Sequence, residues 1–133
     1  MSVLRRVASG VMVNRKKYTL SELYEVIEKI CLLKINMDIK KRLLNELIWK
    51  ISEINGKYNG VRYWTEKALE VKRKRKASEF PKYLTHEHVF SRKYIKEELV
   101  EAKDDMGIIK EILHKIQACV VEKKEHKEDL GHK

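Results

Sequence analysis

The sequence predicts a mainly all-α protein, a compact bundle of about five helices in a single domain that spans residues 1–133. Its length suits one hydrophobic core and hardly two. Five glycines and one proline among many Leu, Ile, Glu and Lys residues are typical of long helices. Apolar residues also recur at intervals of three and four along much of the chain, which is the helical period. A short strand or hairpin is the alternative near residues 1–13, 84–90 and 118–121.

An antiparallel pair of helices is predicted within residues 19–55. Thr19 and Glu22 have the spacing of a capping box, in which each side chain accepts a hydrogen bond from the other residue's backbone N–H. The second helix begins near Asp38, and the Asn-Gly pairs of "NGKYNG" end it. Its apolar stripe consists of Ile39, Leu43, Leu47, Ile51 and Ile54, widened by Leu44 and Ile48.

The third helix is predicted from "VRYWTEKALEVKRKRK", through about Lys76. Pro81 should stop it, because proline disfavours helical geometry in the residue that precedes it. Residues 1–17 lack helical periodicity and are expected to form a basic arm or a strand.

Two helices follow in the C-terminal half. Ser91 is the expected N-cap of the first, and Asp104 or Asp105 that of the second. The stretch "CVV" at 119–121 is β-branched and gives a short strand as the alternative to the end of the last helix. The polar tail at 124–133 is expected to fray.

The positive charge is concentrated in two segments. The chain carries a formal net charge of +10. Residues 1–17 contain five basic and no acidic residues, and residues 61–82 contain eight basic and three acidic ones, so each segment carries +5. These two segments therefore hold the entire excess, which predicts a local basic surface rather than a uniform bias.

Composition argues against a membrane or secreted protein. No apolar run approaches the roughly 20 residues that span a bilayer. The basic N-terminal stretch has no apolar segment, so a secretory signal is not expected. Cys31 and Cys119 each lie in an apolar stretch and are expected to be reduced core thiols. We therefore expect a cytoplasmic location.

A nucleic-acid interface is the first functional hypothesis. The five consecutive cations of "KRKRK" repel one another unless an anion such as a phosphate backbone neutralises them. Upstream, cationic and aromatic residues are mixed as on surfaces that stack on bases. A solvated helix end and an acidic protein partner are the alternatives. The predicted nucleic-acid-binding residues are Arg5, Arg6, Arg15, Lys16, Lys17, Arg62, Trp64, Lys72, Arg73, Lys74, Arg75, Lys76, Arg92 and Lys93.

The stretch "KYLTHEHVFSRKYIKEEL" offers a second hypothesis. In an extended strand His86 and His88 point the same way and Glu87 points to the other face. Such a pair of histidines can hold zinc if a third or fourth ligand is present. In a helix the two side chains would diverge, and two histidines at a helix entrance are the simpler interpretation.

Within this stretch, "THEHVFSRKYIKEEL" resembles the first half of an HNH-type nuclease motif, over residues 84–93. The resemblance implies that Glu87 binds Mg²⁺, Mn²⁺ or another divalent metal and that His88 is the general base for water. The alternative metal ligands are Glu87, His114 and His86. Ser91 stands where the family often has proline, and no asparagine follows Asn59, although the family needs one.

A broader resemblance joins "NGKYNGVRYWTEKALE" and "LTHEHVFSRKY", which together look like small accessory proteins of phages and prophages. This resemblance implies a free-standing protein of a mobile element that acts in the host cytoplasm. Such proteins often bind DNA, RNA or a host defence complex, so an inhibitor of host defence that contacts a nucleoprotein complex is the implied function.

Three functional hypotheses follow, in this order. The first is a non-catalytic basic protein that binds nucleic acid or a nucleoprotein complex without a cofactor. The second is the metal-dependent nuclease. The third is a helical adaptor or homodimer, in which the stripe from Ile39 to Ile54 forms the interface.

Overall fold

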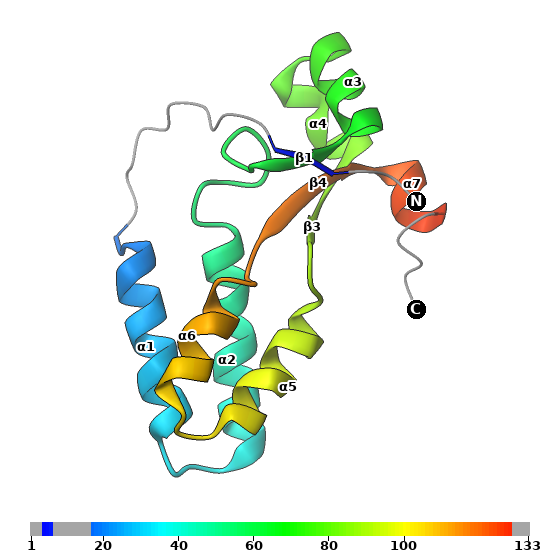
Figure 1. Ribbon diagram of the computed structural model, residues 1–133. Helices are drawn as coiled ribbons and strands as arrows, with labels where there is room; N and C mark the ends of the chain where they lie inside the picture. Colours follow the sequence, from blue (N-terminus) through cyan, green and yellow to red (C-terminus); the bar gives the residue numbers. More distant parts are fainter. Residues whose placement is uncertain (1–3, 7–16, 129–133) are drawn as a thin grey trace. The chain divides into compact units, whose positions relative to one another are not determined.

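The structure is a computed structural model that describes residues 4–6 and 17–128, apart from the side chains of Arg6 and of residues 126–128. In these residues helices combine with a four-stranded mixed sheet (Figure 1). The protein is therefore α/β, and the prediction of a mainly all-α bundle is wrong. Each of the three segments for which a strand was the alternative contains one. No helix in the described part of the chain has the length and apolar character needed to cross a bilayer.

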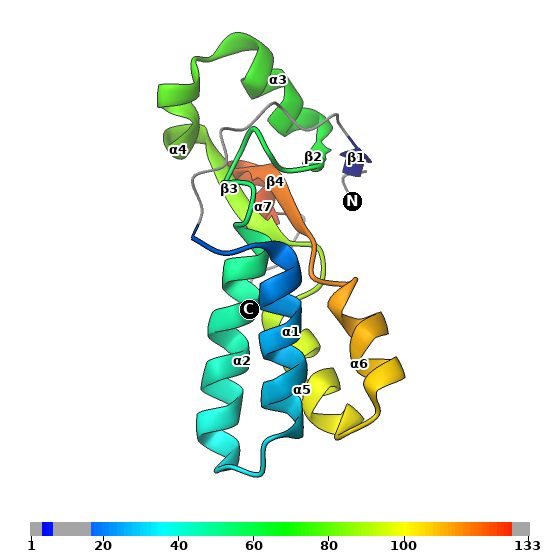
Figure 2. The same cartoon turned by 90° about the vertical axis from the view of Figure 1, so that its left-hand side faces the viewer.

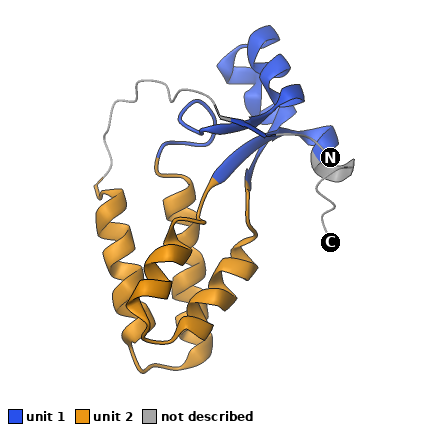
Figure 3. Cartoon of the chain, in the orientation of Figure 1, with its two compact units in different colours: residues 1–13, 55–87, 118–133 blue, residues 14–54, 88–117 orange. Residues whose placement is uncertain are grey.

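The contacts within the chain divide it into two compact units, coloured separately in Figure 3. Unit 1 comprises residues 1–13, 55–87 and 118–133, and unit 2 comprises residues 14–54 and 88–117.

Unit 2 begins with α1 (Leu20–Leu32) and α2 (Met37–Ser52), which lie side by side (Figure 2). The predicted capping box is confirmed, because the Glu22 N–H donates to Thr19 Oγ1 at 3.1 Å and the Thr19 N–H to Glu22 Oε1 at 3.0 Å. Helix α2 begins one residue before the expected Asp38. Asn36 caps it by accepting hydrogen bonds from the N–H groups of Asp38 and Ile39.

Helices α5 (Arg92–Ala102) and α6 (Met106–Leu113) complete unit 2. Both predicted caps are confirmed. Ser91 Oγ accepts from the Tyr94 N–H at 3.1 Å, and Asp105 Oδ1 accepts from the Ile108 N–H at 3.1 Å. The four helices enclose one apolar core of Leu23, Ile27, Ile30, Cys31, Leu44, Ile48, Ile51, Ile95, Leu99, Ile109, Ile112, Leu113 and Ile116.

The predicted stripe of α2 is divided in the structure. Leu44, Ile48 and Ile51 are buried in the core of unit 2, whereas Ile39 is 54% and Leu43 is 41% exposed. The stripe is thus used mainly inside unit 2, and only its N-terminal part faces outward.

Unit 1 is built on a sheet with the strand order β1-β2-β4-β3. Its strands are β1 (Leu4–Arg6), β2 (Tyr63–Thr65), β3 (Leu84–His88) and β4 (Ala118–Glu122), and the last residue of β3 belongs to unit 2. Strand β2 pairs antiparallel with β1 and parallel with β4, with Trp64 opposite Val120.

The helices of unit 1 are α3 (Glu66–Lys74), α4 (Phe80–Tyr83) and α7 (Lys123–Glu128), and the 3₁₀ turn η1 (Ala77–Glu79) precedes α4. The core of this unit consists of Val61, Trp64, Ala68, Phe80, Leu84 and Val120. The rings of Trp64 and Phe80 meet edge to face at 6.3 Å.

The differences from the predicted helices have local causes. "RYWT" was assigned to the third helix, but its aromatic and β-branched residues favour a strand, and Thr65 instead caps α3. Pro81 lies in the first turn of α4, where its missing N–H costs nothing, rather than ending a longer helix. Helix α6 stops at Leu113, and the β-branched stretch after it pairs with β2 as β4. Residues 124–128 of the expected frayed tail belong to α7, and 129–133 lie outside the described residues.

Candidate nucleic-acid interface

Unit 1 has an open groove of about 360 Å³ that is lined mainly by basic side chains. We call this surface the basic groove. Its lining residues are Lys67, Glu70, Val71, Lys74, Arg75, Lys82, Tyr83, Glu122, Lys123 and Lys124. Six of them are cations and two are carboxylates, so the groove presents a strong positive excess to a ligand.

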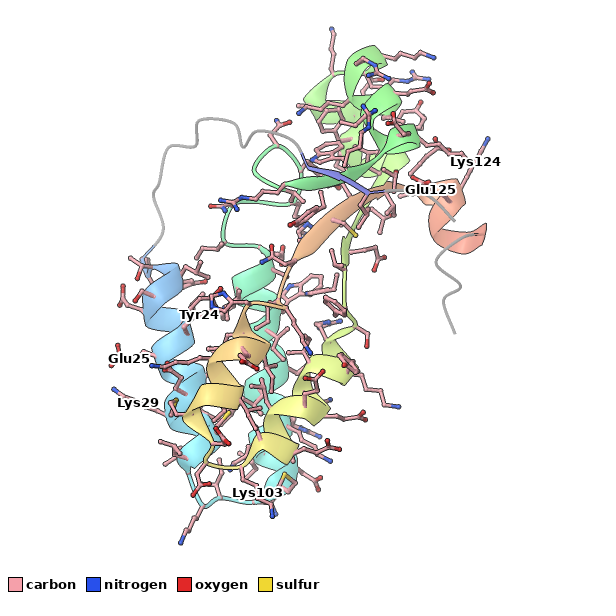
Figure 4. All side chains as sticks on the ribbon, in the orientation of Figure 1. Tyr24, Glu25, Lys29, Lys103, Lys124 and Glu125 are labelled. Carbon is pink, nitrogen blue, oxygen red and sulfur yellow. The ribbon has the colours of Figure 1, made fainter. Side chains whose placement is uncertain are left out.

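Three helices supply the cations of the basic groove. Lys67 and Lys74 are seven residues apart on α3, about two helical turns, and therefore lie on the same side of it. Arg75 is the C-cap of this helix, where cations also complement the partial negative charge of the helix end. Helix α4 contributes Lys82, and α7 contributes Lys123 and Lys124, the latter labelled in Figure 4.

One aromatic side chain lies among these cations. The guanidinium of Arg75 lies over the ring of Tyr83 at 4.4 Å from its centroid, and the ammonium of Lys82 is 5.7 Å from the same centroid. Arg75 also forms an ion pair with Glu79 at 3.8 Å, which helps to hold its position. The groove therefore combines cations with a planar, half-buried aromatic surface.

A buried pair of side chains joins two walls of the groove. The Thr65 hydroxyl accepts a hydrogen bond from the Ala68 N–H at 3.2 Å, which caps α3. It also donates to Oε1 of Glu125 on α7, a carboxylate that is only 1% exposed (Figure 4). The same oxygen accepts from the Glu122 N–H at 2.9 Å. Thr65 and Glu125 thereby fix the start of α3 relative to the start of α7.

The predicted residues of unit 1 divide into two groups. Lys74 and Arg75 line the basic groove, whereas Arg62, Arg73 and Lys76 are exposed and are not among its lining residues.

Other predicted residues of unit 1 make contacts of their own. Arg5 forms an ion pair with Glu66, and the ammonium of Lys72 is 4.9 Å from the centroid of the Trp64 ring. Trp64 is fully buried and donates to the Val61 carbonyl at 2.8 Å, so its ring is a core element and offers no face to a base.

The remaining predicted residues are not brought to the groove. Lys17 and Lys93 are exposed on unit 2, where the guanidinium of Arg92 lies 4.5 Å from the centroid of the Trp49 ring. Arg15 and Lys16 lie outside the described residues, as does the side chain of Arg6.

Four cations of the basic groove were not among the predicted residues, namely Lys67, Lys82, Lys123 and Lys124. Lys67 and Lys82 lie within the basic segment 61–82, so its charge excess contained a signal for them. Lys123 and Lys124 belong to a segment with balanced charge. Only the parallel pairing of β4 with β2 brings them to this face, and that pairing has no local signature.

The histidine segment forms strand β3, and the predicted ligands make contacts within each unit. His86 Nδ1 is 2.9 Å from the Lys57 carbonyl oxygen. In unit 2 the His88 ring packs on Trp49 at 5.4 Å, and the His114 ring lies 6.4 Å from that of Tyr24. Glu87 lies on the opposite strand face from both β3 histidines. Among the side chains that the structure describes, no three His, Cys, Asp or Glu groups are placed to hold a metal ion.

Cys119 is a buried residue of strand β4. Burial, together with the nearby carboxylates of Glu87 and Glu125, raises the pKa of its thiol to about 12. A thiol with such a pKa stays protonated near neutral pH, so Cys119 is a core residue and no nucleophile.

A pocket of about 400 Å³ on unit 2 provides a contrast. It is lined by Ser21, Tyr24, Glu25, Glu28, Lys110, Leu113 and His114, and Figure 4 labels Tyr24 and Glu25. Its two carboxylates outnumber its single lysine. This pocket therefore does not share the positive excess of the basic groove.

Comparison of the chain with profiles of known protein families, with curated protein sequences and with solved structures found no match. The function of the protein is therefore inferred from the residues of the basic groove.

Proposed function

We propose that the protein binds nucleic acid through the basic groove and does so without catalysing a reaction. The observation that carries this proposal is the convergence of six cations from α3, α4 and α7 on one groove that has only two carboxylates. A phosphate backbone supplies negative charge at regular intervals, so several of these cations can each meet a phosphate.

The energetic logic favours a polyanion. Like charges held close together repel one another, and this repulsion lowers stability unless an anion is bound. Binding to nucleic acid also releases condensed counterions, which provides a sequence-independent driving force. Tyr83 adds an aromatic surface of the kind that nucleic-acid grooves use beside their cations.

Charge reversal in the groove tests the proposal. The double variant Lys74→Glu with Lys124→Glu should weaken binding of labelled DNA and RNA oligonucleotides at least about 100-fold, because two phosphate contacts become repulsive. Fluorescence anisotropy at fixed salt measures the affinity.

The matched control is Lys34→Glu with Arg42→Glu, two exposed cations of unit 2 that change the net charge by the same amount. The control should retain affinity within a few-fold. Equal losses in the two double variants would mean that net charge alone attracts the probe, and the groove would lose its assigned role.

A further inference from the structure

We infer that the basic groove takes single-stranded rather than duplex nucleic acid, with one unstacked base placed against the Arg75–Tyr83 pair. This inference depends on the proposed function and specifies its ligand. It rests on the form of the groove, on the stacked pair within it and on the distribution of the surrounding charge.

The form of the site suits a single strand. A protein that reads a duplex inserts a projecting helix or ribbon into the major groove of the nucleic acid. Here the cations instead line a hollow of about 360 Å³, near the lower limit of pockets that hold small ligands. A hollow of this size can accept a splayed-out base, whereas the bases of a duplex are stacked inside the helix.

The Arg75–Tyr83 pair supplies the surface for such a base. The Arg75 guanidinium is planar and lies 4.4 Å from the centre of the Tyr83 ring. Both guanidinium planes and tyrosine rings stack on unpaired bases, and this stacking tolerates any base because each has a π-face. Tyr83 is the aromatic residue among those that line the groove.

The lysines around this pair fit the phosphates on either side of the base. Lys82 neighbours Tyr83 in sequence, and Lys74 neighbours Arg75. Lys123 and Lys124 come from α7, a separate helix. Cations from different elements around one stacking pair match a strand whose backbone passes the pocket while one base enters it.

The test compares a mixed-sequence single strand with a duplex of the same sequence, each as DNA and as RNA, by anisotropy. Wild-type protein should bind the single strand at least about tenfold more tightly than the duplex. Arg75→Lys keeps the charge and loses the planar group, so single-strand affinity should fall roughly 5- to 30-fold. Duplex affinity should change less than about twofold. Arg73→Lys, an exposed neighbour that does not line the groove, is the matched control and should have no effect.

Tyr83 provides an independent variant. Tyr83→Leu should weaken single-strand binding by a similar factor, and Tyr83→Phe should restore it, because the ring and not the hydroxyl is required. Thermal unfolding of each variant reports whether it folds, and Arg75→Lys decides the outcome if Tyr83→Leu does not fold.

The possible failures are distinguishable. Equal affinity for both probe forms, or no loss in Arg75→Lys, overturns the single-strand inference, while loss in Lys74→Glu with Lys124→Glu still supports the groove. Absence of binding to every probe removes the proposed function together with the inference.

Discussion

At the scale of single residues, Thr65 connects two helices of unit 1, α3 and α7. Its hydroxyl serves both as the N-cap of α3 and as the donor to the buried Glu125 carboxylate. A carboxylate that is almost fully buried needs such hydrogen bonds, because its desolvation is costly. Two of the helices that carry the groove cations thus depend on one hydroxyl group.

Thr65→Val should therefore lower the free energy of unfolding by about 2–4 kcal/mol, the sum of a lost cap and a lost hydrogen bond to a buried charged group. The side chains are nearly equal in volume, so packing changes little. Thr65→Ser keeps the hydroxyl and should lose less than about half of that amount. Urea unfolding followed by circular dichroism measures the difference. Equal losses in the two variants would mean that the hydroxyl contributes no more to stability than the methyl group, which would contradict its assigned role.

Cys119 yields a prediction about pH. Its thiol pKa is about 12 in the folded protein, against an ordinary value of 9.0. The thiol therefore contributes stability that is fully present below pH 9 and is lost as the pH rises towards 12. In a Cys31→Ser background, Cys119 should react with a thiol reagent at pH 8 at least about 100-fold more slowly in folded than in unfolded protein. Similar rates in both states would contradict the burial of this thiol.

The residue composition predicted only part of the candidate site. Lys74 and Arg75 were found because "KRKRK" is a continuous run, whereas Lys123 and Lys124 lie in a segment without a positive excess. Trp64 was misplaced because its cationic neighbours made it look like a stacking residue, although its ring fills the core. Local charge identifies a basic segment, but burial and long-range pairing decide which of its members share a surface.

At the scale of elements, α2 shows how one helix face is selected for the core. Ile48 is fully buried, and Ile39, nine residues earlier, is 54% exposed. Both are isoleucines on one helix, and they differ mainly in what covers them. This makes them a matched pair for an energetic test.

Ile48→Ala should lower the free energy of unfolding by about 2–5 kcal/mol, through lost burial and the cavity that remains. Ile39→Ala, the control, should change it by less than about 0.5 kcal/mol, because the side chain is largely in water and alanine favours the helix. Chemical denaturation at one protein concentration measures both. A large loss in Ile39→Ala that diminishes on dilution would instead indicate that this end of α2 is buried against a second copy.

Elements were predicted well where their signals are local. Thr19 and Ser91 were predicted as caps, and the third cap was predicted at Asp104 or Asp105, of which Asp105 is the one observed. These signals are local because the capping hydrogen bond joins residues three apart. The strands were harder, since β2 is three residues long and pairs with partners distant in sequence. A short strand of this kind is formed by its neighbours in the sheet rather than by its own periodicity.

At the scale of the whole molecule, the net charge of +10 sets the expected behaviour with salt. A uniformly positive protein would bind polyanions diffusely, but a groove with six converging cations should give a defined number of phosphate contacts. The number of ions released on binding distinguishes a site from a general attraction.

The nuclease hypothesis gives a whole-molecule prediction as well. If the protein binds nucleic acid without catalysis, as proposed, labelled DNA and RNA should remain intact after incubation with Mn²⁺. The same incubation with EDTA is the control. Cleavage that depends on Mn²⁺ and disappears in His88→Ala would restore the nuclease.

The salt dependence of single-strand binding tests most directly whether nucleic acid binds in the basic groove. The logarithm of the association constant, plotted against the logarithm of the salt concentration, should be linear. Five phosphate contacts, one for each lysine of the groove, give a slope of about −3.5, since each contributes about 0.7 for a single strand. In Lys74→Glu with Lys124→Glu the slope should become shallower by at least about 1.4, whereas Lys34→Glu with Arg42→Glu should leave it unchanged. A slope near zero in the wild-type protein, or one that the groove variant does not alter, would contradict the binding of nucleic acid in the basic groove.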